Sequence, residues 1–166
     1  MSKILIISAT SDKNLELANE LQSLLTSMGT DSGLVVLDKL NLPLYSYEAE
    51  IESGVVEEII EKMKHASGFI FCAPEYNGSV PPVLSNAIAW ISVKSKNWRD
   101  AFNGKFAVIG THSVGDGYRF LTAFRSQLEY MGTNVLARTI SITKEKPLNE
   151  DSVKRILQGL VDLVSI

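Results

Sequence analysis

The sequence lacks residues on which several classes of protein depend. Its 166 residues include one cysteine, Cys72, which excludes a framework of internal disulfides and indicates a reducing compartment. Two histidines without a His-x-x-x-His spacing predict no metal site. A formal net charge of −3 gives no sign of the basic surface that binds nucleic-acid phosphates. We therefore expect no nucleic-acid partner.

Long hydrophobic runs are also missing. No apolar run approaches the roughly 20 residues that cross a bilayer, and Ile4–Ile7 is too short for the core of a signal peptide. We expect a cytoplasmic protein with no membrane partner. A content of 45% hydrophobic and 21% charged residues is typical of globular proteins. The length predicts a single domain that spans residues 1–166.

The common nucleotide-binding motifs are absent as well. A dinucleotide-binding fold needs G-x-G-x-x-G after its first strand, but the chain has Ser8-Ala-Thr-Ser-Asp-Lys13 there, and it has no P-loop. Hydroxyl groups and free N–H groups at the positive end of a helix suit a phosphate dianion. An ordinary helix-capping turn explains the same residues equally well. The candidates at this position are Ser8, Thr10, Ser11, Lys13 and Asn14.

Strand and helix patterns alternate along the chain. Short apolar runs predict five strands, at Lys3–Ser8, Leu34–Asp38, Gly68–Ala73, Lys105–Thr111 and Val135–Ile142. The last of these alternates apolar with polar residues and is typical of an edge strand. Helical periodicity follows each strand, with apolar faces at Leu17–Met28, Val56–Met63, Val83–Val93, Phe120–Met131 and Val153–Val164. This alternation predicts a parallel, doubly wound α/β sheet with helices on both faces.

The loop after the third predicted strand is the strongest candidate for a binding site. Ligands of open α/β sheets bind beyond the carboxyl ends of the strands. Three prolines stiffen this segment, Gly78 permits close approach of the backbone, and Tyr76 offers a flat apolar face. Such a loop suits the edge of a planar heterocycle, although a tight turn stiffened for folding is the alternative. The loop His112–Gly117 is placed to cover the other side of a ligand.

This segment resembles a known family. Pro74-Glu-Tyr-Asn-Gly-Ser-Val-Pro81, followed by Leu84-Ser-Asn-Ala-Ile-Ala-Trp90, is similar to the loop and helix that mark the NAD(P)H-dependent FMN reductases. The resemblance is strong over Phe69–Ser92 and extends in layout to the whole chain. It implies a flavodoxin-like three-layer sandwich with strand order 2-1-3-4-5, FMN at the strand ends and NAD(P)H as co-substrate.

The resemblance also assigns residues to the cofactor. The isoalloxazine ring would contact, mainly through the backbone, Pro74, Glu75, Tyr76, Asn77 and Gly78. The phosphate and ribityl chain would lie on Ser8, Thr10, Ser11, Asn14 and Leu15, and a third loop would contribute Ser113 and Gly115. The first loop of the family usually reads Gly-Ser-x-Arg followed by Ser and Asn. Here it is shorter and has no arginine, so Lys13 would supply a point charge in its place.

The helix Val83–Val93 has two apolar faces. Leu84, Ile88 and Ile91 form one face, and Val83, Ala87 and Trp90 form the other. A helix that covers a sheet needs only one such face. We expect a second subunit to bury the other face, as in a homodimer or a dimer of dimers. The alternative is burial beneath the link Lys94–Asn103, where Trp98 could cover it.

The function implied by the resemblance is that of an FMN-dependent NAD(P)H oxidoreductase. Hydride would pass from reduced nicotinamide through FMN to a flavin, quinone or azo-type acceptor, so the chemistry lies in the cofactor and no catalytic side chain is predicted. Two alternatives remain: a flavodoxin-like electron carrier, and a non-catalytic module that has lost its flavin. Cys72 is expected to be an inert packing residue, and His112 a hydrogen-bonded loop residue or a group that polarises the substrate.

Overall fold

Strands and helices alternate along the chain in the computed structural model, which describes residues 3–52 and 54–165. The strands are β1 (Ile4–Ser8), β2 (Ser32–Val36), β3 (Gly68–Cys72), β4 (Phe106–His112), β5 (Asn134–Val135) and β6 (Ile140–Ile142). The helices are α1 (Lys13–Ser27), α2 (Val55–His65), α3 (Pro82–Lys94), α4 (Tyr118–Tyr130) and α5 (Glu150–Val164), with a short 3₁₀ turn, η1, at Asp38–Leu40. The predicted α/β alternation is confirmed.

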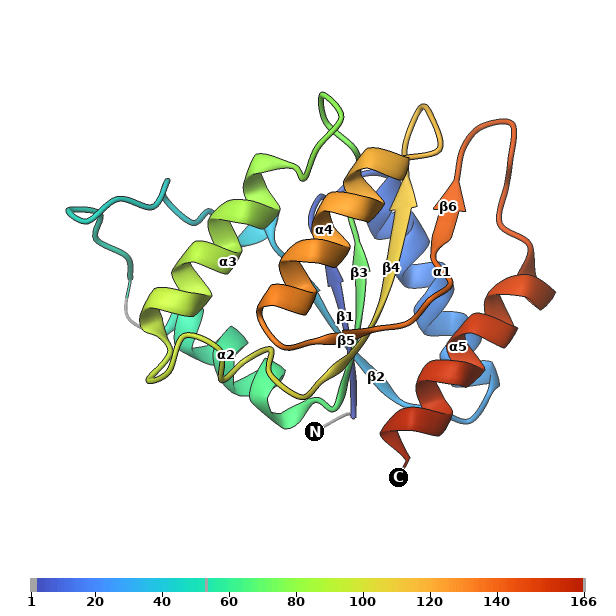
Figure 1. The fold of residues 1–166 in the computed structure, drawn as a ribbon, viewed down its shortest axis with the longest axis horizontal. Helices are drawn as coiled ribbons and strands as arrows, with labels where there is room; N and C mark the ends of the chain where they lie inside the picture. Colours follow the sequence, from blue (N-terminus) through green and yellow to red (C-terminus); the bar gives the residue numbers. More distant parts are fainter. Residues whose placement is uncertain (1–2, 53, 166) are drawn as a thin grey trace.

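All strand pairings in the described sheet are parallel, in the order β2-β1-β3-β4-β5, with β6 also paired to β4. Two helices, α1 and α5, cover one face of the sheet, and α2, α3 and α4 cover the other (Figure 1). The three-layer architecture and the strand order 2-1-3-4-5 are therefore as expected. Because the pairings are parallel, the loops that follow β1, β3 and β4 emerge together at one edge of the sheet.

The predicted edge strand Val135–Ile142 is wrong as a single element. The structure divides it into β5 and β6, which pair with opposite ends of β4. Between the two pairings β4 advances from Ala107 to Gly110, whereas the edge segment advances from Val135 to Ile140. The edge segment is therefore longer than the part of β4 that it faces, so it cannot stay paired with β4 between β5 and β6. The Arg125 guanidinium donates to the carbonyl groups of Val135 and Leu136, at 3.1 and 2.7 Å.

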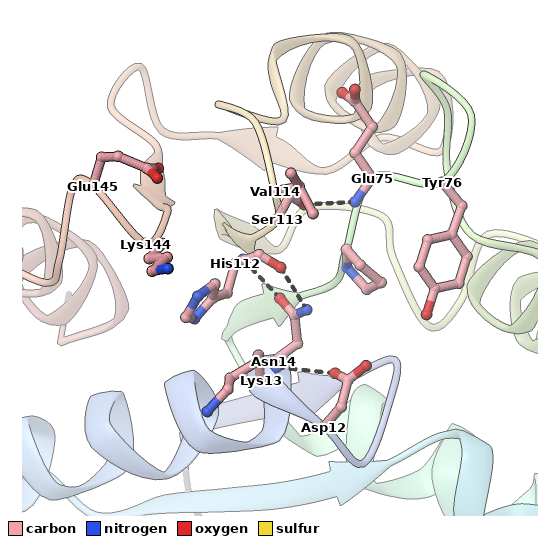
Figure 2. Close-up of a pocket in the computed structure, with 11 residues that line it drawn as sticks. Asp12, Lys13, Asn14, Glu75, Tyr76, His112, Ser113, Val114, Lys144 and Glu145 are labelled. Atoms are coloured by element: carbon pink, nitrogen blue, oxygen red, sulfur yellow. Dashed lines mark hydrogen bonds between the residues drawn. The ribbon is translucent and has the colours of Figure 1, made fainter.

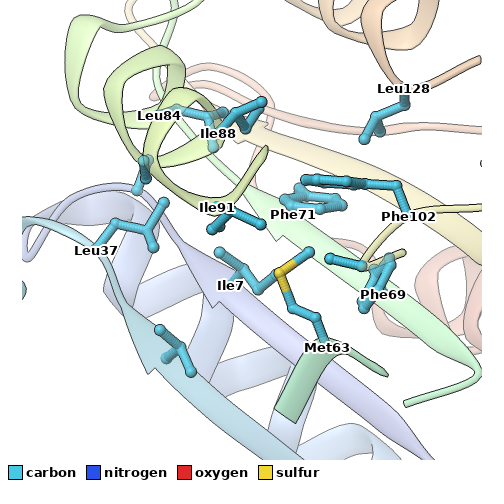
Figure 3. Close-up of a cluster of buried hydrophobic side chains, with 14 of the residues drawn as sticks. Ile7, Leu37, Met63, Phe69, Phe71, Leu84, Ile88, Ile91, Phe102 and Leu128 are labelled. Atoms are coloured by element: carbon cyan, nitrogen blue, oxygen red, sulfur yellow. The ribbon is translucent and has the colours of Figure 1, made fainter. Parts of the chain in front are cut away.

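The hydrophobic core lies on both faces of the central strand β3, whose five residues are all buried. Phe69 and Phe71 point into the cluster beneath α2, α3 and α4, which Figure 3 shows. Ile70 and Cys72 point into the cluster beneath α1 and α5. This alternation is the period of a strand that is covered on both sides. It explains why the apolar runs of the sequence predicted the strands well.

Cys72 is the packing residue that the sequence predicted. Its side chain is 0% exposed, and burial raises the pKa of the thiol to about 12. We expect a thiol-alkylating reagent to leave Cys72 unmodified in the folded protein between pH 7 and 9, because both the thiolate form and access to the sulfur are lacking. In urea the same thiol should react within minutes, and faster with rising pH. Mass spectrometry of both samples tests this, and rapid modification of the folded protein would contradict it.

The second apolar face of α3 is covered by the chain itself. Trp90 is 2% exposed, its Nε1–H donates to the Pro43 carbonyl at 2.7 Å, and Tyr45 packs edge-on against its ring with centroids 5.2 Å apart. The Asn86 side chain accepts the Tyr45 N–H at 2.8 Å and donates to the Pro43 carbonyl at 3.0 Å. The connection between β2 and α2 is thus fastened along α3.

This arrangement removes the reason for which a second subunit was expected on α3. The alternative was that Trp98, in the link after α3, covers this face of the helix, and it is wrong. That ring packs against Tyr130 with centroids 5.7 Å apart, and the Arg99 guanidinium lies over it at 4.4 Å. The homodimer itself stays a prediction. Within residues 3–52 and 54–165, no helix is both long and apolar enough to span a membrane.

Candidate functional site

A cavity of about 450 Å³ opens at the carboxyl ends of the central strands (Figure 2). Its wall comes from the loops after β1, β3 and β4 and from the connection after β6. The lining residues are Asp12, Lys13, Asn14, Pro74, Glu75, Tyr76, His112, Ser113, Val114, Lys144 and Glu145. The volume lies within the range of small-molecule sites, and the position is the one that open α/β sheets use.

The loop after β3 forms a rigid hairpin at one side of this cavity. The backbone N–H and C=O groups of Tyr76 and Ser79 bond each other, at 3.2 and 3.0 Å. Between them Asn77 and Gly78 have φ values of 51° and 69°, which a type I′ turn requires and which Asn and Gly tolerate best. The turn projects Tyr76, 44% exposed, at the rim of the cavity. The Asn-Gly pair is explained by this turn.

Glu75 and Ser113 join two of the loops. The Glu75 N–H donates to Ser113 Oγ at 2.8 Å, and Ser113 Oγ lies 2.9 Å from Thr111 Oγ1. The Glu75 carboxylate turns away from the cavity and accepts the Phe120 N–H at 2.9 Å (Figure 2). A carboxylate is favourable there because the first turn of α4 carries unpaired N–H groups and the positive end of the helix dipole. Both residues hold the loops in place.

Asn14 joins α1 to β4 across the base of the cavity. Its side chain is 1% exposed, its Nδ2 donates to the His112 carbonyl at 3.0 Å, and its Oδ1 accepts the His112 N–H at 2.9 Å. The amide therefore satisfies both backbone groups of the last residue of β4. Asn14 lines the cavity, as a site residue should, but its polar atoms are bonded to His112.

The hydroxyl groups of the loop after β1 are bonded within the chain. Ser8 is 0% exposed and donates to the Thr10 carbonyl at 2.8 Å, while Thr10 Oγ1 donates to Asp12 at 2.6 Å. Ser11 donates both its N–H, at 2.6 Å, and its hydroxyl to the Asp38 carboxylate. Asp12 is also the N-cap of α1 and accepts the Asn14 N–H at 3.2 Å. The helix-capping turn considered for this loop is therefore present.

The Asp12 carboxylate is stabilised in its charged form. Partial burial acts to raise its pKa, but the hydrogen bonds from the Thr10 hydroxyl and from Asn14 outweigh it, so the pKa lies below the ordinary value. Asp12 is therefore negatively charged at neutral pH.

The structure brings six of the thirteen predicted cofactor residues to the cavity wall: Lys13, Asn14, Pro74, Glu75, Tyr76 and Ser113. The other seven lie outside the lining of this cavity: Ser8, Thr10, Ser11, Leu15, Asn77, Gly78 and Gly115. Their contact with a cofactor stays a prediction. Gly78 faces Arg119 instead, whose Cδ would lie 3.0 Å from an added Cβ.

Several residues of the cavity wall were not among the thirteen predicted cofactor residues, although His112 and Val114 belong to the loop that was expected to cover a ligand: Asp12, His112, Val114, Lys144 and Glu145. Lys144 and Glu145 follow β6, the second half of the strand predicted at Val135–Ile142. The rule that sites lie beyond the carboxyl ends of strands would have found them. Among the described residues, no group of three or more His, Cys, Asp or Glu side chains could hold a metal ion.

Comparison with known proteins agrees with this geometry. The quinone reductase of Escherichia coli K12 is 37% identical over 78 residues, which cover 45% of this chain and 40% of that protein. An NAD(P)H-dependent FMN reductase of Pseudomonas aeruginosa is 34% identical over 118 residues, covering 70% of this chain and 57% of that protein. The chain thus matches about half the length of these curated relatives.

Solved structures share the fold over the whole length. The flavoenzyme NAD(P)H:(acceptor) oxidoreductase FerB from Paracoccus denitrificans superimposes with a TM-score of 0.78 at 18% identity, covering 99% of this chain and 98% of that one. At this identity the likeness shows the fold alone. The family model described as NADPH-dependent FMN reductase matches residues 2–146, most of the chain. The chain therefore belongs to the NADPH-dependent FMN reductase family.

Proposed function

We propose that the protein is an FMN-dependent NAD(P)H oxidoreductase that reduces a small acceptor of the quinone class. The family supports the reaction type, and the name of the Escherichia coli relative supports the acceptor class. The observation that carries the proposal is the cavity at the strand ends, which joins a rigid aromatic hairpin to the N-terminus of α1. A cytoplasmic location and a homodimer remain predictions beside it.

The cavity has the chemistry that FMN needs. Pro74, Tyr76 and Val114 give it an apolar side for a planar ring, and its volume of about 450 Å³ suits a ligand of this size. Two lysines, Lys13 and Lys144, give it a positive region for a phosphate. Apolar and cationic regions therefore share one cavity, as a flavin mononucleotide requires.

Bound FMN supplies the hydride chemistry itself, so the chain has to bind and orient the cofactor and exclude competing reactions. The type I′ hairpin fixes the position of Tyr76, and the bond between Glu75 and Ser113 fixes this hairpin relative to the loop after β4. The Glu75 carboxylate is held by α4 and is thereby removed from proton transfer in the cavity. This agrees with a site that binds and tunes a cofactor without an acid–base side chain of its own.

Flavin binding and turnover test the proposal together. We expect the purified protein to be yellow or to become so with FMN, to unfold at a higher temperature when FMN is added, and to oxidise NADPH or NADH with a benzoquinone acceptor. An electron carrier would bind FMN but show no turnover with NAD(P)H unless a reductase is added. A module that has lost flavin would show no thermal shift with FMN, and that result would contradict the proposal.

A further inference from the structure

The phosphate group of a ligand in this cavity needs donors that the loop after β1 does not offer freely. The family arginine is missing from this loop. The hydroxyls of Ser8, Thr10 and Ser11 are bonded to the Thr10 carbonyl and to the carboxylates of Asp12 and Asp38. A phosphate dianion that approached the hydroxyls of Thr10 and Ser11 would have to displace carboxylates and would meet their charge at short range.

Basic side chains gather at another side of the cavity. Lys13 is the first residue of α1, His112 the last residue of β4, and Lys144 lies two residues beyond β6. Figure 2 shows the three on one side of the cavity, with Tyr76 on the opposite side. All three also line an adjoining cavity of about 470 Å³ between α1 and the connection that leads to α5. The cluster therefore lies where two hollows meet.

The pairing of the charged groups leaves this cluster available to an anion. Within the part of the chain that the structure describes, no hydrogen bond or ion pair engages the Lys144 ammonium group. Lys13 pairs with Glu16 at 2.7 Å, but both side chains are more than half exposed, and such a pair is weak and easily exchanged.

The carboxylates that line the cavity already have donors of their own. Asp12 is bonded to Thr10 and Asn14, Glu75 to the Phe120 N–H, and Glu145 accepts the Thr143 hydroxyl at 3.3 Å. Their acceptor oxygens are directed to groups of the chain. The two ammonium groups are therefore the charges in the wall that a bound anion can recruit.

We propose that Lys13 and Lys144, beside His112 and the N-terminus of α1, bind a phosphate monoester in place of the missing arginine of the β1 loop. The inference rests on the proposed function and names the phosphate subsite of the same cavity. Two ligands supply this chemistry: the 5′-phosphate of FMN and the 2′-phosphate of NADPH. Flexible lysine stems reach either one from two neighbouring elements, α1 and the connection after β6.

Lys144→Ala tests the proposal, with Lys146→Ala as the matched control. Lys146 is exposed in the same connection and lines neither cavity. Fluorescence titration of the full chain with FMN and with riboflavin separates the phosphate from the ring. We expect Lys144→Ala to weaken FMN about tenfold, because a charge-assisted contact is lost, and to leave riboflavin affinity unchanged. Lys144→Arg should retain most FMN affinity, and added salt should reduce the difference between FMN and riboflavin.

The outcomes distinguish FMN from NADPH as the source of the phosphate. They also distinguish failure of the phosphate subsite from failure of the proposed function. Unchanged FMN affinity, combined with a selective rise of the KM for NADPH relative to NADH, would assign the cluster to the dinucleotide. Unchanged values for both ligands in Lys144→Ala and in Lys13→Ala would overturn the inference while the proposed function stands. A wild-type protein that binds neither FMN nor riboflavin would overturn the proposed function, and the inference with it.

Discussion

Replacing Phe71 with alanine is expected to lower the free energy of unfolding by about 4 kcal/mol, the range for large-to-small changes at fully packed aromatic positions. Phe71 is 2% exposed on the central strand, and its ring meets those of Phe69 and Phe124 edge-on, with centroids 5.6 and 5.0 Å apart. The change removes buried apolar area and leaves a cavity beneath α4. Urea unfolding followed by circular dichroism measures it.

Phe71→Leu separates packing from any special role of the ring. Leucine keeps much of the buried volume, so we expect a smaller loss, about 1–2 kcal/mol. Because a domain is stabilised by only about 5–15 kcal/mol, the alanine variant should unfold at a clearly lower urea concentration than the leucine variant. Equal midpoints for the two variants and the wild type would mean that this cluster is not packed as Figure 3 shows.

Asn14→Ala is expected to cost about 3 kcal/mol of stability at a position that the sequence presents as a ligand contact. The change leaves both the N–H and the C=O of His112 without the partners they now have, at 2.9 and 3.0 Å. A buried backbone group that loses its partner costs about 1–3 kcal/mol. The same urea experiment measures the loss. Asn19→Ala is the matched control, since Asn19 is exposed on the same helix.

Asn14→Asp adds a pH dependence with a defined sign. A protonated aspartic acid can donate to the His112 carbonyl, as the Asn14 amide does, whereas its carboxylate would face that oxygen. Burial and this repulsion raise the folded-state pKa above the unfolded value of about 3.9. Relative to wild type the variant should therefore be most stable below about pH 4, where both states are protonated, and lose stability as the pH rises toward 7. A pH-independent difference, or an Asn14→Ala variant as stable as Asn19→Ala, would contradict this role of Asn14.

The strands were predictable because burial on two faces leaves a continuous apolar run in the sequence. Gly68–Cys72 is such a run, and all five of its residues are buried. The prediction failed at Val135–Ile142, where the break depends on the length of the facing strand β4 and on Arg125, ten residues before Val135. Alternation of apolar and polar residues cannot report the register of a neighbouring strand.

The helix α3 shows a second limit. Its two apolar faces are real, but the sequence does not say what covers the second one. The structure supplies Pro43 and Tyr45, more than forty residues earlier in the chain, and so makes a second subunit unnecessary at Trp90. An apolar helix face indicates that the face is buried, but not which part of the molecule buries it.

The candidate site also has some features that the local sequence determines and others that depend on the tertiary structure. The sequence by itself determined the hairpin after β3, because Asn77 and Gly78 fit a local turn whose positive φ values few other residues tolerate. It also determined the parallel sheet, and with it the edge at which a ligand lies, since apolar runs and helical periodicity are local patterns.

Only the tertiary structure decided how the polar residues are used. Ser11 is bonded to Asp38, Asn14 to His112, and Lys144 lies across the cavity from Tyr76. These partners are 27 and 98 residues apart in the two bonded pairs. A hydroxyl, amide or ammonium group bonds whichever group the fold places within about 3 Å, so its role is settled by distance in space and not by position in the chain.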